Sequence, residues 1–321
     1  MAEPAASTYE NIQRPVSVAI VSKGRPDVLD DTLESVFRQT VRPHQVIVVV
    51  TAEEDLPRKP WGDAVQILFA PAGTSVQRNK ALEVIPLSVD FVAYFDDDVE
   101  LRPDYLEQAL LFFERNPNSV ALSGRLIGDG QITREEGRRR LEAYAHKNEV
   151  RGLYHSAGDL HSLHGCNMVI RRAFLDYEKF DENLALYGFA EDYDLSMRLE
   201  RYGRVGKFAR CVAVHLAWPH GRVNEVQRGY CLIANQWYCI KKGTVHVPPF
   251  QAQIWYWNVV VRRMIFATIR QILRRNRACD WKGRLKGALL ALTDIARGRC
   301  DPRRVLELEE PAKATQSGSG Q

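Results

Sequence analysis

The feature that most constrains this chain is a buried-strand pattern that ends in a cluster of acids. Phe91 to Phe95 is a short apolar run, and Asp96, Asp97 and Asp98 follow it directly. Such a run is typical of a strand buried on both faces, and open α/β sheets bind ligands at the carboxyl ends of their strands. Three neighbouring carboxylates repel one another and lose solvation on burial unless a cation or donor groups compensate. The run therefore predicts either a divalent metal site or a solvated acid-rich turn before the next helix.

The spacing of these acids indicates which of them can share a cation. Alternate side chains of an extended segment project to the same face. Asp96 and Asp98 can therefore reach one ion, while Asp97 points away. Asp96 and Asp98 are the candidate metal ligands.

The order of predicted elements is typical of an α/β fold. Strand patterns and amphipathic helical patterns alternate along the first third of the chain, which implies a parallel sheet. The predicted strands are residues 16–21, 45–50, 66–70, 91–95, 120–123, 168–170 and 211–216, and the predicted helices are residues 27–39, 75–84, 105–115 and 135–149. Asp104 and Glu107 have the spacing of a capping box, so we expect them to cap the third of these helices.

Composition excludes several classes of protein. The chain has 321 residues, of which 45% are apolar, enough for the core of one large or two small domains. The first residues have neither a basic start nor an apolar core, and no segment has the composition of a spanning helix, so we expect neither a signal peptide nor a membrane span. Six cysteines form no C-x-x-C pair, which argues against a zinc module and a disulfide framework. We expect a cytoplasmic protein.

Positive charge is concentrated near the carboxyl end. Residues 262–304 contain 13 Lys or Arg and 3 Asp and so carry +10, whereas the whole chain carries +4. The aromatic and basic residues from Ile254 onward, and the leucines between Leu285 and Leu292, indicate cationic amphipathic helices. Such helices can lie on an anionic membrane surface, pack on the catalytic domain or contact a second subunit. The sequence leaves these alternatives open and predicts no oligomeric state.

A second acidic cluster occurs at residues 188–195. Glu191 and Asp192 fall in the first turn of a predicted helix that ends at Gly203. The inward side chains of this helix are expected to be Leu195, Leu199 and Tyr202. Acids in a first turn interact favourably with the helix dipole, which explains them without catalysis. The alternative is that Asp192 faces the first acid cluster and takes a proton from an attacking hydroxyl.

Taken in order, the sequence motifs resemble those of the family 2 glycosyltransferases. The match extends over residues 15–216. Its blocks are Val16–Val21, Arg25-Pro26, Leu33–Val36, Gln39-Thr40, Pro43 and Val46–Val49; Gly73 with Arg78-Asn79-Lys80; Asp96–Asp98 with Pro103; Gly165–Met168 with Arg171-Arg172; Phe180–Glu182; Glu191–Leu195; and His215.

The resemblance implies a GT-A fold, with a mixed, mainly parallel sheet flanked by helices. It implies a nucleotide-diphosphate sugar donor, a Mn²⁺ or Mg²⁺ ion, and transfer with inversion. Asp96 and Asp98 would hold the metal, and His215 would complete the metal shell or contact the diphosphate. Asp192 would be the base, and Arg78 would pair with a phosphate. The further predicted substrate-binding residues are Lys23, Arg25, Asp96, Asp97, Asn167, Glu191 and Arg222.

The chain departs from the family pattern in three places. Val50 and Thr51 stand where the family often has two aspartates near the nucleoside, and the first loop, residues 21–25, lacks the common aromatic. Lys23 can supply a phosphate contact there instead. The Q-x-x-R-W motif of processive members is absent, so we expect transfer of one sugar per event. The polar loop at 220–222 predicts either a lid or an ordinary connection.

The predicted organisation has four parts. Residues 1–14 are a flexible amino terminus, 15–225 the GT-A catalytic domain, 226–305 a basic amphipathic helical region and 306–321 a disordered tail. Within the catalytic domain, residues 15–103 form the nucleotide-sugar half and 104–225 the acceptor-side half. The resemblance and the basic region suggest a glycan or lipid-linked acceptor in bacterial surface glycan synthesis, with peripheral membrane contact.

Two other functions remain as alternatives. A sugar-nucleotide nucleotidyltransferase would share the fold, although no glycine-rich loop with a lysine follows the first strand. A nucleic-acid binder would use the basic region, but no recognised reader motif occurs there and the apolar residues keep helical spacing. We therefore expect no nucleic-acid partner.

Overall fold

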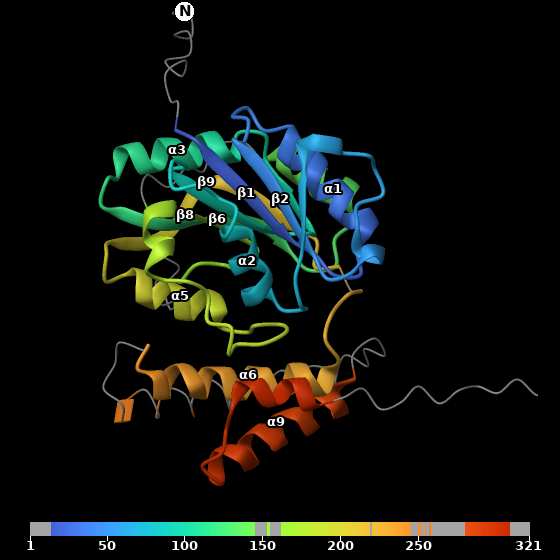
Figure 1. Cartoon of the computed structure of the whole chain (residues 1–321), viewed down its shortest axis with the longest axis vertical. Coiled ribbons are helices and arrows are strands. Elements are labelled where there is room, and N and C mark those ends of the chain that lie inside the picture. Colours follow the sequence, from blue (N-terminus) through green and yellow to red (C-terminus); the bar gives the residue numbers. More distant parts are fainter. Residues whose placement is uncertain are drawn as a thin grey trace, which may run out of the picture. The chain divides into compact units, whose positions relative to one another are not determined.

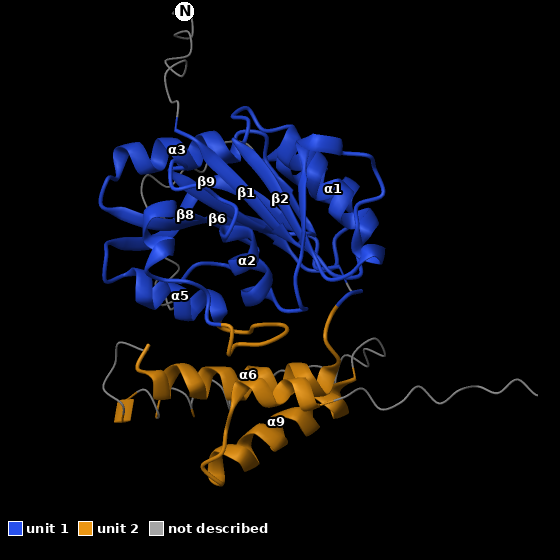
Figure 2. Cartoon of the chain, in the orientation of Figure 1, with its two compact units in different colours: residues 1–181, 191–221 blue, residues 182–190, 222–321 orange. Residues whose placement is uncertain are grey.

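The chain divides into two compact units, shown in separate colours in Figure 2. The first comprises residues 1–181 and 191–221, and the second comprises residues 182–190 and 222–321. The computed structural model describes residues 14–144, 153–154, 162–218, 220–244, 250–251, 254, 257 and 280–308. The predicted flexible amino terminus, most of the segment from Ile254 to Cys279 and nearly all of the predicted tail lie outside these described residues. The predicted domain limits stay predictions.

The described strands of the first unit form one nine-stranded mixed sheet (Figure 1). They are β1 (Val16–Val21), β2 (Gln45–Val50), β3 (Gln66–Phe69), β4 (Phe91–Asp96), β5 (Val99–Leu101), β6 (Ser119–Asp129), β7 (Leu153–Tyr154), β8 (Asn167–Arg171) and β9 (Arg204–His215). Their order is β3-β2-β1-β4-β8-β6-β9-β5, with β7 paired to β9. Strands β3, β2, β1 and β4 run parallel, and β8 pairs antiparallel with both β4 and β6.

Helices cover both faces of this sheet. They are α1 (Pro26–Phe37), α2 (Thr74–Leu82), α3 (Tyr105–Arg115), α4 (Arg134–Ala143) and α5 (Glu191–Leu199). Helices α1 and α3 share one apolar core with alternate residues of β1 and β4, while α2 and α5 share a second core with the residues between them. Val18 and Ile20 thus face one core and Ala19 and Val21 the other. The prediction of a mixed α/β fold with strands buried on both faces is confirmed.

Several predicted details of the fold are wrong. Asp104 makes no capping hydrogen bond, because its carboxylate accepts from Arg102, and Glu107 accepts from Thr40 Oγ1. Tyr202 is 43% exposed, since α5 ends at Leu199 and the chain turns before it reaches Tyr202.

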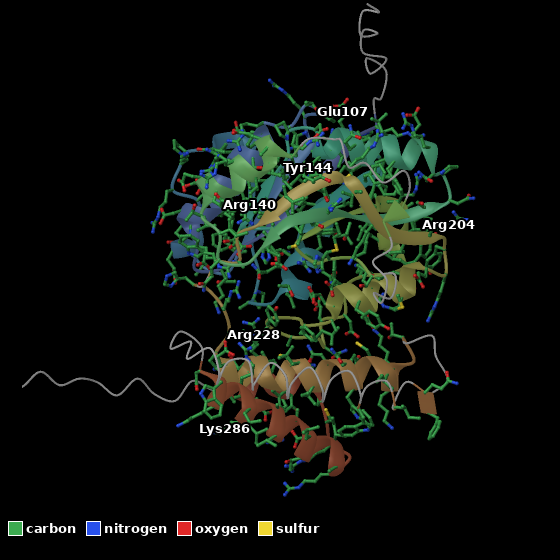
Figure 3. The ribbon with its side chains drawn as sticks, turned by 180° about the vertical axis from the view of Figure 1, so that it is seen from behind. Glu107, Arg140, Tyr144, Arg204, Arg228 and Lys286 are labelled. Carbon is green, nitrogen blue, oxygen red and sulfur yellow. The ribbon has the colours of Figure 1, made fainter. Side chains whose placement is uncertain are left out.

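The largest extensions of the predicted elements are in two strands. β9 begins at Arg204, which is labelled in Figure 3, well before the predicted start at residue 211. β6 continues to Asp129, six residues beyond the predicted end at Ser123. The two strands pair with each other. The unpredicted start of β9 therefore has backbone partners in β6, and the unpredicted end of β6 has partners in β9.

The described part of the second unit consists mainly of two helices. They are α6 (Glu225–Lys242) and α9 (Trp281–Ala296), and a 3₁₀ helix, η6 (Pro302–Glu307), follows α9. α6 begins with a capping box of Asn224 and Gln227 and ends at Gly243, whose φ of 78° is left-handed. No helix among the described residues has the length and hydropathy of a membrane span.

Residues 182–190 belong to the same unit as α6. Asn235, which is buried on α6, donates from Nδ2 to the carbonyl oxygen of Phe189 over 2.9 Å. Leu186, Gly188 and Ala190 all have positive φ values, so the backbone of this segment is held in a conformation that non-glycine residues rarely adopt. Its carboxyl end leads directly into α5 and the second acidic cluster.

Candidate active site

The first acidic cluster lies at the carboxyl end of β4, in the middle of the sheet. Asp96 is the last residue of β4, and Asp97 and Asp98 form the turn into β5. β5 pairs antiparallel with β9 so that Val99 lies opposite His215. This pairing brings the imidazole to the acids: His215 Nε2 lies 3.2 Å from Asp98 Oδ1.

Asp96, Asp98 and His215 each offer one potential metal ligand, and these atoms all lie within 4.8 Å of one another. The structure therefore brings together the three predicted metal ligands, from the end of β4, the turn after it and the end of β9. Two carboxylate oxygens and an imidazole nitrogen are a donor set that suits a divalent cation such as Mn²⁺. Asp98 is only 1% exposed, so its charge needs a compensating group.

Arg25 supplies part of that compensation. Its Nη1 lies 2.7 Å from Asp97 Oδ1 and 3.1 Å from Asp98 Oδ2. Burial opposes charge on Asp98, but hydrogen bonds from His215 and the Trp218 backbone N–H, together with the Arg25 charge, hold the pKa of Asp98 below its usual value. Arg25 thus contacts the acids directly, and its contact with substrate stays a prediction.

Asp97 lies on the other side of the turn. Ser22 Oγ donates to Asp97 Oδ2 over 2.6 Å, and Asp97 is 3% exposed. Burial raises the pKa of Asp97 to about 7, although Arg25 and Ser22 act in the opposite direction. Asp97 therefore fastens the turn to the loop after β1, while its predicted contact with substrate remains untested.

His215 is oriented by a residue that the sequence did not single out. Asp129 Oδ1 lies 2.7 Å from His215 Nδ1, and the two residues are opposite each other in the pairing of β6 with β9. Burial disfavours the charged imidazole, but the hydrogen bonds to Asp129 and Asp98 outweigh it and raise the pKa of His215 to about 10. The Asp129-Gly130 pair, which is typical of a turn, is the local sequence signal at this position.

Arg78 joins the two acidic clusters. The side chain is buried on α2, and Nη1 lies 2.8 Å from Glu191 Oε1 while Nη2 lies 3.0 Å from Asp96 Oδ1. Nη2 also donates to the carbonyl oxygen of Gly165 over 2.9 Å, and the guanidinium lies over the ring of Phe180. These contacts make Arg78 a positioning residue for the acids, and its predicted phosphate contact stays a prediction.

Asp192 is held beside this bridge by backbone groups. The N–H of Gly165 donates to Asp192 Oδ2 over 2.8 Å, and the N–H of Tyr193 donates to Oδ1 over 2.7 Å. One peptide residue, Gly165, therefore contacts Asp192 with its nitrogen and Arg78 with its oxygen. Asp192 is partly exposed, and its role as the base stays a prediction.

Glu191 differs from its neighbour in environment. It is 7% exposed, and burial together with the charge of Asp192 raises the pKa of Glu191 to about 8, against the effect of Arg78. Glu191 therefore binds a proton more readily than an exposed glutamate does, and its predicted contact with substrate stays a prediction. Two adjacent carboxyl groups in different environments are a common arrangement where one must stay neutral and the other must act as a base.

The remaining predicted site residues lie in different surroundings. Lys23 is exposed and makes no ion pair with any described residue, so it is free to meet an anion. Asn167 is fully buried at the start of β8, and neither its Oδ1 nor its Nδ2 has a partner among the described groups. Arg222 belongs to the second unit, so the structure does not place it relative to the acids.

The loop after β9 is fastened to the loop after β1. Arg25 Nε donates to the carbonyl oxygen of His220 over 2.5 Å, and the backbone of Gly221 lies against Lys23. The φ of Gly221 is +72°, and a Cβ there would come within 2.1 Å of Lys23 O. Only glycine allows this close approach, so the loop carrying Trp218 is held at the acids in this structure.

Comparison with known proteins identifies the family. The model of the family described as Glycosyl transferase family 2 matches residues 17–177, half of the chain. This chain belongs to glycosyltransferase family 2. The match contains β1 to β4, the first acidic cluster and Gly165, and it ends before Asp192 and His215.

Two other proteins are similar to this chain. The chain is 27% identical over 181 residues to the glucosyl-dolichyl phosphate glucuronosyltransferase of Haloferax volcanii, an alignment that covers 54% of this chain and 57% of that protein. A mannosyltransferase from Pyrobaculum calidifontis, solved with GDP-Man and Mn²⁺, superposes with a TM-score of 0.52 at 18% identity, over 92% of this chain and 85% of that one. This structural likeness supports the predicted GT-A fold of this glycosyltransferase family member.

Proposed function

We propose that the protein is a metal-dependent, inverting glycosyltransferase that moves one sugar per event from a nucleotide-diphosphate sugar to a hydroxyl acceptor. The observation that carries the proposal is the single connected site in the first unit. Asp96, Asp98 and His215 form a metal-binding set, and Arg78 and Gly165 connect Asp96 to the proposed base, Asp192.

The metal would be Mn²⁺ or Mg²⁺, held by Asp96, Asp98 and His215. Buried Asp98 and partly exposed Asp96 bring negative charge to one point, which fits a cation there. When bound, such an ion neutralises the charge that develops on a departing nucleoside diphosphate. The mannosyltransferase with the similar fold was solved with Mn²⁺ and a nucleotide sugar, which supports this assignment.

Asp192 would act on the acceptor. The acceptor oxygen forms a bond to the anomeric carbon as the bond from that carbon to the diphosphate oxygen breaks, and the nucleoside diphosphate leaves with the electron pair. Asp192 takes the hydroxyl proton. The two backbone N–H groups that bind its carboxylate fix its orientation, and the raised pKa of Glu191 limits the negative charge beside it.

A lipid-linked acceptor is the version of this function that we favour. The relative from Haloferax volcanii is named a glucosyl-dolichyl phosphate glucuronosyltransferase, and glucosyl-dolichyl phosphate is a sugar linked to a lipid. A lipid-linked acceptor would require the enzyme to work at a membrane surface. The donor base, the transferred sugar and the predicted cytoplasmic location stay predictions.

Thermal stability with candidate nucleotides tests the proposal directly. The melting temperature of the full chain is measured with UDP, GDP, dTDP and CMP, each with and without Mn²⁺. A nucleotide present at a hundred times its dissociation constant adds about 2.7 kcal/mol, which raises the melting temperature by several degrees. We expect one nucleotide to stabilise the protein only when Mn²⁺ is present.

The same melting series on Asp98→Asn and on Asp90→Asn tests whether the nucleotide-dependent shift arises at the proposed metal site. Asp98→Asn removes a proposed ligand and keeps the side-chain shape, so the metal-dependent shift should disappear. Asp90 is exposed and lies outside the site, so Asp90→Asn should behave as the wild type. If no nucleotide stabilises the wild type in the presence of Mn²⁺, the proposed donor site is wrong.

A further inference from the structure

Helix α9 packs against α6 through its smallest residues. The buried positions of α9 include Gly283, Gly287, Ala288 and Ala291. A Cβ added at Gly287 would come within 1.8 Å of the carbonyl oxygen of Val226, and one added at Gly229 of α6 would come within 2.0 Å of the carbonyl oxygen of Arg284. The two backbones are therefore nearly in contact, and no larger side chain fits between them.

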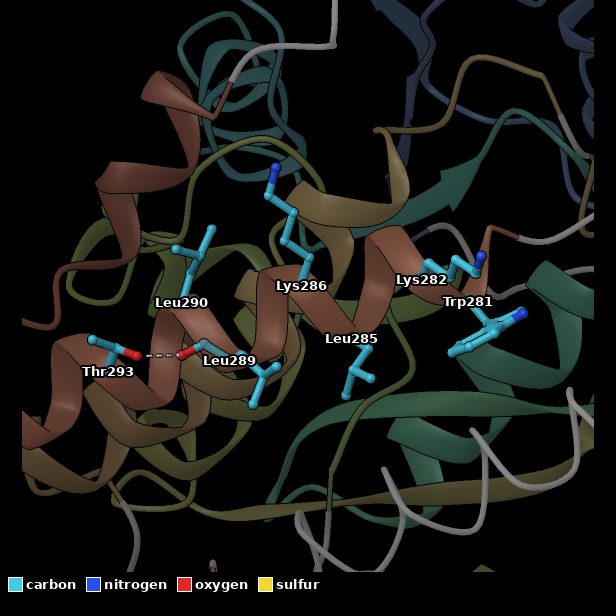
Figure 4. Close-up of a pocket in the computed structure, with 7 residues that line it drawn as sticks. All are labelled: Trp281, Lys282, Leu285, Lys286, Leu289, Leu290 and Thr293. Atoms are coloured by element: carbon cyan, nitrogen blue, oxygen red, sulfur yellow. Dashed lines mark hydrogen bonds between the residues drawn. The ribbon is translucent and has the colours of Figure 1, made fainter.

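Some large apolar side chains of α9 line its outer face, while Leu292 and Ile295 pack against the core of this unit. Figure 4 shows the hollow along this face, and all seven described lining residues come from α9. They are Trp281, Lys282, Leu285, Lys286, Leu289, Leu290 and Thr293. Leu289 is 53% exposed and Leu285 is half-buried, whereas Leu290 also packs partly against the core of this unit. A helix on the surface of a soluble domain usually buries most of its leucines, so the largely exposed Leu289, three residues from exposed Lys286, gives this face a mixed apolar and cationic character.

The charge on the outer face is of one sign. Lys282 and Lys286 are exposed. Lys286 is labelled in Figure 3, which views the molecule from behind relative to Figure 1. The single acid between Trp281 and Ala296 is Asp294, which is buried and bound by Tyr230, Arg299 and Arg304. The outer face thus combines exposed leucine with lysines and carries no carboxylate.

We propose that this outer face of α9 docks on the surface of an anionic lipid bilayer. Leucine and tryptophan side chains would enter the boundary between headgroups and acyl chains, and the two lysines would meet lipid phosphates. The proposal deepens the proposed function and rests on it in one respect, because a lipid-linked acceptor gives the enzyme a reason to work at a membrane. The chemistry of the face itself comes only from α9.

The charge pattern favours a bilayer over two other occupants. A second copy of the chain in a symmetric contact would bring Lys282 and Lys286 against the same lysines, and that repulsion would have no described acid to offset it. A nucleic acid would be bound by the lysines but would leave the leucines without an apolar partner. A bilayer satisfies both kinds of side chain.

Flotation with lipid vesicles tests the docking without donor, acceptor or metal. The full chain is mixed with vesicles of phosphatidylcholine alone and with vesicles of equimolar phosphatidylcholine and phosphatidylglycerol. We expect binding to the anionic vesicles, reduced by about tenfold for each leucine in Leu285→Ala/Leu289→Ala. Lys282→Gln/Lys286→Gln should lose about fivefold for each lysine, and only at low salt. Ala and Gln both favour helix, so α9 should be retained.

A matched control removes the same charge elsewhere. Arg115 and Lys179 are exposed on the first unit, so Arg115→Gln/Lys179→Gln lowers the net charge equally without touching α9. This variant should float with the anionic vesicles as the wild type does. Equal losses in the control and in Lys282→Gln/Lys286→Gln would assign the binding to net charge and overturn the proposal.

Four further results would also overturn it. The wild type could fail to float with anionic vesicles, or the leucine variant could bind as well as the wild type. The leucine variant could also melt several degrees lower in solution, which would show that the face packs inside the protein. Stronger binding to a DNA duplex than to vesicles would assign the face to nucleic acid. None of these results depends on the nucleotide series, so a failed docking site and a failed transferase assignment are distinguishable.

Discussion

Arg78 donates a hydrogen bond from Nη1 to Glu191 Oε1 over 2.8 Å, and both side chains are buried. Its second terminal nitrogen lies 3.0 Å from Asp96 Oδ1. One rigid guanidinium therefore fixes the separation of two acidic clusters that are nearly a hundred residues apart in sequence. The proposed metal ligands and the proposed base depend on this one side chain for their relative placement.

Replacing Arg78 by methionine should destabilise the protein strongly. Arg78→Met keeps an unbranched apolar stem but leaves buried Glu191 and the carbonyl oxygen of Gly165 without their donor. Each buried polar group left without its hydrogen-bond partner costs about 1–3 kcal/mol, and the Arg78–Asp96 ion pair is lost as well. Urea denaturation measures this loss, and Arg115→Met, which changes an exposed arginine, should cost little. A variant as stable as the wild type would show that the bridge does not hold the clusters.

The raised pKa of Glu191 predicts how stability changes with pH. Burial and the charge of Asp192 raise this pKa from 4.5 to about 8, so the folded chain holds a proton that the unfolded chain releases earlier. The contribution is complete below about pH 4.5 and is lost as the pH rises through about 8. Glu191→Gln resembles the protonated form at every pH. We therefore expect its advantage over the wild type in free energy of unfolding to grow between these values.

The matching measurement uses an exposed glutamate. Denaturation of the wild type, Glu191→Gln and Glu83→Gln is followed at several pH values, and Glu83 is exposed on the surface beyond α2. The difference between the wild type and Glu83→Gln should stay constant with pH. A constant difference for Glu191→Gln as well would mean that Glu191 is ionised throughout and would remove its proposed neutral role.

The fold was largely predictable because its signals are local. The apolar run at β1 and the helical stripe of α1 lie within a residue or two of their predicted limits. The start of β9 was missed for a physical reason: residues 204–210 mix basic and apolar side chains, and their strand conformation depends on pairing with β6 and β7. Such pairing joins segments that are distant in sequence, and no local pattern reveals it.

The candidate site was predictable in its chemistry and not in its connections. Alternation along a strand selected Asp96 and Asp98, which the structure brings together with His215. Arg78 was expected at a phosphate, whereas the structure buries it between carboxyl groups. Gly165 connects Arg78 and Asp192 through its backbone atoms alone. A contact made only by backbone atoms does not depend on a particular side chain, so the residue type does not reveal it.

Changing Asp129 should weaken metal binding without removing a ligand. Asp129 Oδ1 lies 2.7 Å from His215 Nδ1 and so fixes the direction of Nε2, which faces Asp98. Partners of this kind typically change metal affinity by about 10- to 100-fold when they are replaced. Titration calorimetry with Mn²⁺ should show that loss for Asp129→Asn. Asp63 is exposed, so Asp63→Asn should bind Mn²⁺ normally, and normal binding by both variants would contradict the role of Asp129.

An alanine at Gly221 should displace the loop that carries Trp218. The new Cβ would come within 2.1 Å of Lys23 O, so the loop after β9 must move away from the loop after β1. We expect nucleotide with Mn²⁺ to stabilise Gly221→Ala much less than the wild type. Gly62 also has a positive φ, of 53°, but nothing lies within 4 Å of its would-be Cβ. Gly62→Ala therefore introduces only backbone strain, about 1 kcal/mol, and should keep nucleotide binding. If both variants bind nucleotide equally well, the close approach of Gly221 to Lys23 is not important for the site.

Asn235 on α6 should affect catalysis from outside the first unit. Its Nδ2 holds the carbonyl oxygen of Phe189, three residues before Asp192, in a segment with three positive φ values. Asn235→Ala would release that segment and let the proposed base move, and a small misplacement of a reacting group can cost up to about 100-fold in rate. We expect kcat to fall while the dissociation constant of the metal-bound nucleotide stays unchanged, because every described donor-side residue except Arg222 lies in the first unit.

The neighbouring Gln236 provides the control for that experiment. Gln236 lies on the same helix and makes no described hydrogen bond to residues 182–190, so Gln236→Ala should leave kcat unchanged. Both constants are measured with the nucleotide sugar whose nucleotide gives the metal-dependent melting shift. If Asn235→Ala loses nucleotide affinity in proportion to its rate, the substitution has disturbed the whole site and Asn235 is not a positioning residue for Asp192. A selective loss of kcat would instead show that the helical unit controls the base through residues 182–190.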